Sequence, residues 1–346
     1  MKKLLFLLLL LPAFVFSQIP AGYYDSAEGL SGTALKSALH NIIDNHDVQS
    51  YSDLHNHFEN TDKKPNGKVW DMYSDVPGGT PPYEYSFVSG DQCGSYNSEA
   101  DCYNREHSWP KSWFGGEVSP MYSDLFILYP TDGYVNGKRS SFPYGEVGSA
   151  TWTSMNGSKL GTCNFPGYNG TVFEPIDEYK GDFARAYFYM TVRYLGEDSG
   201  WPGSDMTTGA QLKPWALELM RKWDFEDPVS TKEIDRNNEV YNIQGNRNPF
   251  IDNPNWVDSI YGAYLYIENI INHTPYSYQI NKSKLSLEFS KKDLQYQIVS
   301  LTGFVLLSGI SNEKENIEVE IKNSGVFLLK VWNNNETWSE KLFVIF

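Results

Sequence analysis

Cysteine is scarce in this sequence, which has three in 346 residues: Cys93, Cys102 and Cys163. Their spacing does not follow the paired pattern of zinc ligands, so a structural zinc module is excluded. Cys93 and Cys102 bracket a short segment that begins Gly-Ser-Tyr-Asn, and they would close a small disulfide loop in an exported protein. Cys163 is then left over, and we expect it to be buried or free.

Positive charge is also in short supply. The chain has 28 Lys and Arg residues against 43 Asp and Glu residues, which gives a net charge of −15 and an isoelectric point near 4.8. The deficit is uneven, because residues 101–193 hold eight basic and ten acidic residues, a balance of −2. Any binding of a polyanion should therefore use this segment, and it should be modest in affinity and sensitive to salt.

Long hydrophobic runs are absent after the N-terminus, where no run approaches the roughly 18–20 apolar residues of a membrane helix. The run Leu4–Val15 is shorter than that, follows Lys2-Lys3 and precedes the small residue Ser17. This pattern is typical of a signal peptide, so we expect residues 1–17 to be removed. The rest of the chain would then fold in an oxidising, extracytoplasmic setting.

The chain is long enough for one large hydrophobic core and a second small domain. Alternating apolar residues predict strands over residues 68–74 and 85–88. Ser31 is the expected N-cap of a helix in the first predicted helical stretch. Apolar residues at helix-like spacing predict helical stretches over residues 23–46, 179–194, 214–225, 232–244 and 256–271.

Residues with catalytic potential concentrate in residues 104–116, where Glu106 directly precedes His107. An imidazole is easily held neutral near pH 7, so it can take a proton from water. A carboxylate is a hard oxygen ligand suited to Mg²⁺. A Glu-His pair alone is more often a solvated salt bridge, and a functional interpretation gains support from a second polar segment, residues 123–140.

Several long motifs follow one another in a fixed order: Arg105–Gly115, Leu128–Arg139, Val172–Pro175, Ala184–Met190 and Gln244–Phe250. Together they resemble the motifs of the secreted endonuclease I family, over roughly residues 20–272. The resemblance implies a non-specific nuclease with a ββα-metal active site, acting on DNA and, by extension, on RNA.

The resemblance also implies roles for individual residues. His107, presented at a strand end, would be the general base that deprotonates water. Glu106 and Asn136 would hold a divalent metal, with Mg²⁺ the first choice and Mn²⁺ and Ca²⁺ the alternatives. Asn136 would lie on a short helix that starts near Gly133 or Tyr134. Neighbouring side chains of a strand point to opposite faces, so the chain should bend at Glu106-His107 for both to face one phosphate.

Cations near the motifs are candidates for contacts with substrate phosphates, which carry no sequence information. A surface cation without a partner is the alternative for each, and Arg185 has the further alternative of pairing with Asp177 or Glu178. The candidates are Arg105, Lys138, Arg139 and Arg185.

One departure from the family pattern follows Asp124-Leu125. The family has a His and then another polar residue there, whereas this chain has Phe126 and Ile127. Groups that support metal ligands can change metal affinity or activity by roughly 10- to 100-fold. The alternative function is therefore a catalytically impaired, secreted binding or adhesion protein on the same scaffold.

The character of the sequence changes near residues 273–275. From Leu285 onward, short alternating apolar runs separated by turns predict a small antiparallel β-sandwich of roughly 70 residues. Its motifs Val299–Gly303, Ser324–Val331 and Lys341–Val344 resemble the C-terminal sorting domains of the type IX secretion system of Bacteroidota. A generic binding or spacer sandwich is the alternative.

The expected fold is α+β, with a ββα-metal nuclease core embedded in a mainly helical domain and followed by the β-sandwich. We expect three parts: a signal peptide (1–17), a nuclease domain (18–272) and a sorting domain (273–346). The expected partners are nucleic acid and the type IX machinery, with no membrane span. The expected location is outside the cell or at its surface.

Overall fold

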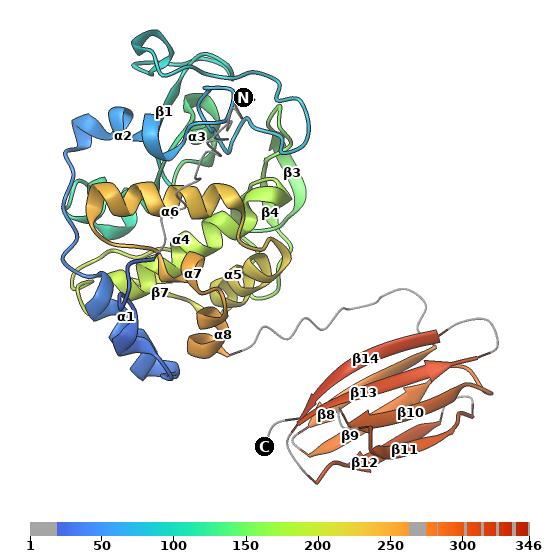
Figure 1. Ribbon diagram of the computed structural model, residues 1–346. Helices are drawn as coiled ribbons and strands as arrows, with labels where there is room; N and C mark the ends of the chain where they lie inside the picture. Colours follow the sequence, from blue (N-terminus) through green and yellow to red (C-terminus); the bar gives the residue numbers. More distant parts are fainter. Residues whose placement is uncertain are drawn as a thin grey trace, which may run out of the picture. The chain divides into compact units, whose positions relative to one another are not determined.

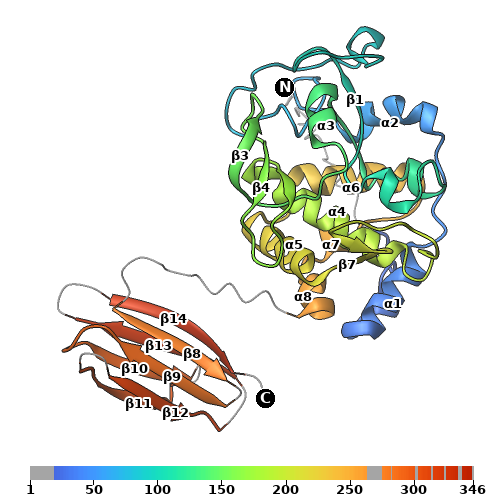
Figure 2. The same cartoon turned by 180° about the vertical axis from the view of Figure 1, so that it is seen from behind.

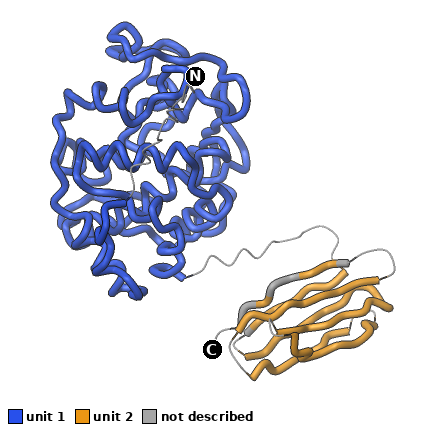
Figure 3. The backbone as a smooth tube through the Cα atoms, viewed as in Figure 1, with its two compact units in different colours: residues 1–265 blue, residues 266–346 orange. Residues whose placement is uncertain are grey.

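The computed structural model divides the chain into two compact units, residues 1–265 and 266–346 (Figure 3). The expected signal peptide and the expected boundary between residues 272 and 273 both lie outside the part of the chain that is described. The described residues are 19–262, 275–281, 283–300, 303–312, 315–322, 325–333 and 337–344.

Helix α4 (Lys180–Arg193) lies at the centre of unit 1 (Figure 1). All 14 of its residues are buried, so the face formed by Phe183, Tyr187 and Met190 is only part of its contact surface. The large hydrophobic core of the unit is built around these residues. None of the helices in the described ranges is both long and apolar enough to cross a membrane.

Local sequence signals fix the ends of the helices around α4. Helix α1 (Gly32–Ile43) starts after Ser31 as expected, although the Ser31 side chain makes no capping hydrogen bond. Helix α5 (Pro214–Glu226) starts with proline, whose fixed φ suits the first helical position. Helix α6 (Thr231–Gln244) starts with a capping box. The shorter helices are α2 (Leu54–Thr61), α3 (Gly133–Arg139), α7 (Pro249–Asp252) and α8 (Asn255–Tyr261).

Strands β1 (Tyr103–His107) and β2 (Leu128–Asp132) form a two-stranded antiparallel sheet in which Glu106 pairs with Tyr129 and His107 with Leu128. Helix α3 follows β2 directly, and the Asp132 carboxylate caps it by accepting a hydrogen bond from the Val135 amide. The other strands of unit 1 are β3 (Val147–Thr153), β4 (Lys159–Cys163), β5 (Thr171–Glu174), β6 (Thr207–Thr208) and β7 (Gln211–Leu212). Figure 2 shows β3 and β4 beside α3.

The strands expected over residues 68–74 and 85–88 do not form. One backbone hydrogen bond joins these segments, from the Val69 amide to the Tyr85 carbonyl, at 2.9 Å. The buried carboxylate of Asp71 instead accepts hydrogen bonds from the amides of Tyr73 (2.8 Å) and Asp132 (2.9 Å). Such bonds between side chains and backbone compete with a strand ladder, which alternation of apolar residues does not reveal.

The expected disulfide between Cys93 and Cys102 is present, and Cys163 is buried and free. The loop that the disulfide closes packs against the start of α3. A Cβ atom on Gly133 would lie 2.5 Å from the Cys93 sulfur, so only glycine permits this close approach. The disulfide loop and α3 therefore hold each other in place.

Unit 2 consists of two antiparallel sheets, with strand orders β11-β10-β13-β14 and β12-β9-β8. Side chains of both sheets share one hydrophobic core. In β13 the buried side chains are Phe327, Leu329 and Val331, whereas Val326 and Leu328 are half-exposed. The strands are β8 (Tyr276–Asn281), β9 (Lys284–Phe289), β10 (Gln295–Ser300), β11 (Val305–Ile310), β12 (Asn316–Glu320), β13 (Gly325–Trp332) and β14 (Thr337–Val344).

Candidate active site

Helix α3 covers one face of the β1–β2 hairpin. The side-chain amide of Asn136 donates a hydrogen bond to Asn104 Oδ1 at 2.7 Å, and Arg139 Nη1 donates to Glu106 Oε1 at 2.9 Å. Asn104 and Glu106 are two residues apart in β1, so they share a face of the hairpin. The structure thus brings Glu106, Asn136 and Arg139 together.

The two oxygens of the buried Glu106 carboxylate have different surroundings. Oε1 accepts hydrogen bonds from the Tyr73 hydroxyl and from Arg139, both at 2.9 Å, whereas Oε2 has no hydrogen-bond partner among the described residues. Burial raises the pKa of Glu106 to about 7, and the guanidinium of Arg139 opposes this shift. One oxygen is therefore anchored, and the other is open to a cation.

Arg139 is fully buried, unlike a residue that meets substrate in solution. Besides Glu106, it donates hydrogen bonds to the backbone carbonyls of His107 and Ser108, and its guanidinium lies 4.5 Å from the ring centre of Tyr144. These interactions occupy Arg139 within the protein. It orients Glu106, and a contact with a substrate phosphate would require it to leave this position.

His107 lies on the opposite face of β1 from Glu106. The ladder with β2 runs through both residues without a register shift, so the bend expected between them is absent. The His107 Nε2–H group donates to the Tyr122 carbonyl at 3.0 Å, which leaves the lone pair on Nδ1. Burial lowers the pKa of His107 to about 4, so its imidazole is neutral near pH 7.

Two tyrosines lie beside the imidazole of His107. The rings of Tyr51 and Tyr122 stack at 4.0 Å and lie nearly parallel to the His107 ring, at 11° and 13°. Arg105 lies 4.1 Å from the Tyr51 ring centre and donates to the Tyr51 carbonyl, and Lys111 lies 5.3 Å from the Tyr122 ring centre. The half-exposed Arg105 and the exposed Lys111 thus bring positive charge to the His107 side.

The other two cation candidates differ in exposure. Lys138, at the end of α3, is half-exposed, with its ammonium 5.0 Å from the ring centre of Tyr134. Arg185 is fully buried and pairs with Glu233 and Asp224, the latter at 2.8 Å, rather than with Asp177 or Glu178. Lys138 is therefore accessible to a phosphate, whereas Arg185 joins helices inside the core.

Phe126 and Ile127, which depart from the family pattern, are both buried in the large core. The Phe126 ring lies 4.6 Å from that of Tyr189 on α4, and the Ile127 carbonyl accepts a hydrogen bond from the Ser108 amide at 2.8 Å. These side chains therefore contribute to packing behind the hairpin.

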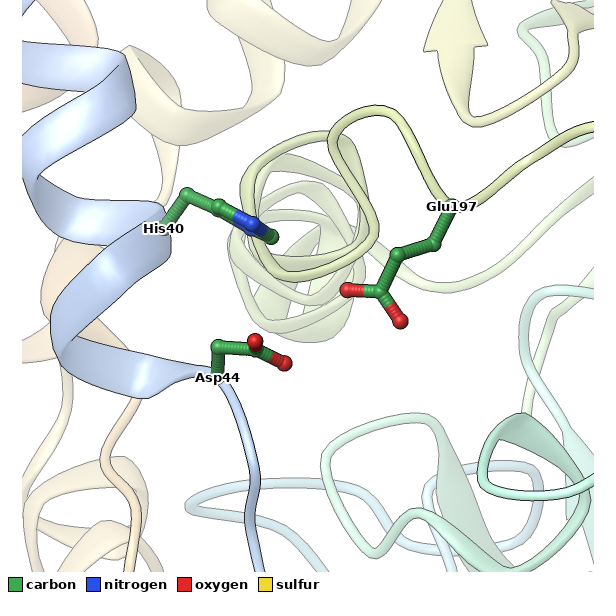
Figure 4. Close-up of side chains that lie close together, drawn as sticks. All are labelled: His40, Asp44 and Glu197. Atoms are coloured by element: carbon green, nitrogen blue, oxygen red, sulfur yellow. The ribbon is translucent and has the colours of Figure 1, made fainter.

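A separate group of possible metal ligands lies at the end of α1, where His40, Asp44 and Glu197 point toward one another (Figure 4). Arg193 already occupies this position, because its Nη1 lies 2.8 Å from Asp44 and 2.7 Å from Glu197. His40 Nδ1 is 3.0 Å from the Val192 carbonyl, to which it donates. The guanidinium thus pairs with both carboxylates, and we assign no metal to this group.

A model of the endonuclease I family matches residues 31–255, a range that includes Glu106, His107 and Asn136. The chain belongs to the endonuclease I family. This membership agrees with the neutral imidazole and the carboxylate on neighbouring residues of β1.

The relatives of this endonuclease I family member include both ribonucleases and a deoxyribonuclease. The chain is 39% identical over 248 residues to an extracellular ribonuclease of Bacillus amyloliquefaciens, covering 69% of this chain and 78% of the relative. It is 35% identical to an extracellular ribonuclease of Bacillus subtilis (strain 168), again over 248 residues, 69% of this chain and 78% of the relative. An extracellular deoxyribonuclease of Aeromonas hydrophila is 29% identical over 138 residues, 39% of this chain and 51% of the relative. Together with the family match, these similarities support a secreted nuclease.

Proposed function

We propose that this protein hydrolyses phosphodiester bonds of RNA and DNA without sequence specificity, with His107 as general base and Glu106 and Asn136 as ligands of one divalent metal. The observation that carries the proposal is the pair formed by Glu106 and His107, each anchored by one atom and open at another. The names of the relatives support both substrates, since they include ribonucleases and a deoxyribonuclease.

The donor set fits a hard divalent cation. Glu106 Oε2 is open, and the Asn136 side-chain nitrogen is tied to Asn104, which leaves the Asn136 amide oxygen as a second donor from the same face. Mg²⁺ takes oxygen ligands and often has only one or two from the protein. When bound, it would stabilise negative charge on the phosphate and on the leaving oxygen.

Other residues of the chain have separate roles in the proposed reaction. His107 Nδ1 accepts the proton of the attacking water, and the Tyr122 carbonyl holds the ring in the required tautomer. Arg105 and Lys138 contact substrate phosphates, since both are half-exposed. The side chains of Glu106 and His107 project from opposite faces of β1. In the proposal, the reacting phosphate therefore lies at the outer edge of this strand, where it can reach both. Within the described residues, that edge carries only the isolated bridge between Gln92 and Tyr103.

The proposal extends to the domains. The β1–β2 hairpin with α3 forms the ββα-metal core, within a nuclease domain of residues 18–272. Residues 1–17 form a cleaved signal peptide. Residues 273–346 form a sorting domain for the type IX machinery, a role supported by a two-sheet unit with its own hydrophobic core.

The test uses the chain from Gln18, with supercoiled plasmid and total RNA as substrates. We expect cleavage with Mg²⁺, none after EDTA, and a loss of roughly 10²- to 10⁴-fold in His107→Ala, the range that a general base contributes. His57→Ala, which changes a half-exposed histidine on α2, is the matched control and should cleave normally. Native-rate cleavage by His107→Ala would overturn the assigned role, and a folded protein inactive with Mg²⁺, Mn²⁺ and Ca²⁺ would overturn the nuclease.

A further inference from the structure

A hollow of about 590 Å³ opens where the turn after β1 meets the loop after α3. The residues that line it include Trp113, Phe142 and Tyr168, together with Gly170 and Asp205. None of the described residues that line it is a lysine or an arginine. This volume lies within the range of roughly 300–1,000 Å³ that is usual for small-molecule sites.

The hollow is continuous with the elements of the proposed active site. Trp113 adjoins Phe114, whose ring centre lies 6.0 Å from that of His107. On the other wall, the Phe142 amide donates a hydrogen bond to the carbonyl of Arg139, which holds Glu106. Two walls of the hollow are thus linked to residues that contact His107 and Glu106.

The lining favours a flat, uncharged ring over a phosphate. Phe142 is 37% exposed, so its ring is accessible to a base. Tyr168 is half-exposed, stacks on Trp215 at 4.6 Å and 8°, and donates its hydroxyl proton to Asp205 at 2.9 Å. Aromatic faces stack on any nucleobase, and a carboxylate accepts hydrogen bonds from base amino groups. The charge of Asp205 would repel a phosphate.

We propose that this hollow binds an unstacked nucleobase of a nucleotide that flanks the reacting phosphate, and that the enzyme therefore prefers single-stranded nucleic acid. The inference rests on the proposed function, which supplies the polynucleotide. A base inside a duplex is stacked and paired, so it reaches the hollow only after an unfavourable flipping step. A single strand avoids this step.

Binding of fluorescent oligonucleotides to the chain from Gln18 with His107→Ala tests the proposal without cleavage. The probes are single-stranded RNA, single-stranded DNA and a DNA duplex of the same sequence, with Mg²⁺. Adding Phe142→Ala should raise Kd for both single strands about fivefold or more, the lower end of what base stacking contributes. Phe142→Trp should retain tight binding, because its ring can still stack.

Phe225→Ala is the matched control, because Phe225 is an exposed phenylalanine of the same unit that does not line the hollow. A single strand whose nucleotides all lack a base should bind the His107→Ala parent and its Phe142→Ala derivative with the same Kd, because no ring is then left to stack. Equal weakening by Phe225→Ala, or equal weakening of duplex binding by Phe142→Ala, would overturn the inference. Mg²⁺-dependent cleavage by the wild-type chain is measured separately, so failure of the proposed function is distinguished from failure of the hollow.

Discussion

Tyr73 and Glu106 illustrate how a residue far away in the sequence can set the chemistry of a carboxylate. The Tyr73 hydroxyl donates to Glu106 Oε1 at 2.9 Å and is 2.8 Å from the Tyr144 hydroxyl, all of them buried. With Arg139 on the same oxygen, the carboxylate has one fixed orientation. Such support commonly changes metal affinity, because it fixes both the position and the charge of a ligand.

Tyr73→Phe removes one donor from Glu106 and keeps the ring. We expect the Mg²⁺ concentration for half-maximal activity to rise about tenfold, since Glu106 is then less well oriented and easier to protonate. Activity titrated with Mg²⁺ measures this shift. Tyr194→Phe is the control, because its buried hydroxyl donates to Asp124 at 2.8 Å, and it should leave the titration unchanged.

The pKa values of Glu106 and His107 predict which group limits activity at low pH. His107, with a pKa of about 4, is already an unprotonated base at pH 5–6, whereas Glu106, with a pKa of about 7, is still protonated there. Activity at low Mg²⁺ should therefore rise with pH around 7. Higher Mg²⁺ should move this rise to lower pH, because the metal competes with the proton for the carboxylate. A pH profile that ignores Mg²⁺ concentration would contradict the assignment.

The site could be predicted from the sequence only where its residues are close together in the chain. Glu106, His107 and Asn136 lie in two motifs, but Tyr73 and Tyr51 reach them from segments with no catalytic signature. The sequence also shows which residues are charged but not which are buried, so it does not distinguish the buried Arg139 from the accessible Lys138 beside it.

Arg185 connects three helices, because it extends from α4 to Asp224 on α5 and Glu233 on α6. Arg185→Ala would leave these two carboxylates without their cation in the core. Breaking a buried pair in this way typically costs about 3–5 kcal/mol. We expect a loss of this order in the free energy of unfolding, measured with urea.

Lys138→Ala is the matched comparison for Arg185→Ala, since it removes an accessible cation at the end of α3. Its effect on stability should stay within about 0.5 kcal/mol. It should instead weaken nucleic-acid binding and reduce the slope of log K against log salt by about 1. If Arg185→Ala altered the salt slope without changing stability, the phosphate role would return to Arg185.

The helices were more predictable than the strands of unit 1, for a physical reason. The expected stretch 232–244 matches α6 closely because its ends depend on local groups, such as the Ser230 capping box and Gly245, with φ of 77°. A strand depends on a partner elsewhere in the chain. Residues 68–74 form no strand ladder, because Asp71 binds the backbone amides of Tyr73 in the same segment and of Asp132 in another.

The two units divide the molecule so that every residue proposed for chemistry lies in unit 1. A chain of residues 18–272 should therefore cleave RNA with the same kcat/KM as the chain of residues 18–346. The type IX proposal further predicts that a bacterium producing the protein without residues 273–346 keeps it inside the cell. The full-length His107→Ala protein should be exported. Nuclease activity in the cell and medium fractions measures export of the shortened chain, and immunodetection measures export of the inactive His107→Ala chain. Normal export of the shortened chain would contradict the sorting role.

The net charge of −15 has a consequence at the scale of the whole molecule, because a polyanion is repelled from most of a strongly acidic surface. Residues 101–193, which contain β1, β2 and α3, are close to neutral. Nucleic acid should thus approach through this region, where electrostatic repulsion is weakest. Composition alone revealed this imbalance, whereas the hollow beside it depends on loops that meet only in the folded chain.

The complete enclosure of α4 has a consequence for hydrogen exchange. Its 14 buried residues give its backbone amides no route to solvent through a local fluctuation of one exposed face. These amides should exchange only when unit 1 opens as a whole, and so they should be the last in this unit to take up deuterium. The exchange rate of a single peptide from α4 would then report the stability of the entire catalytic unit.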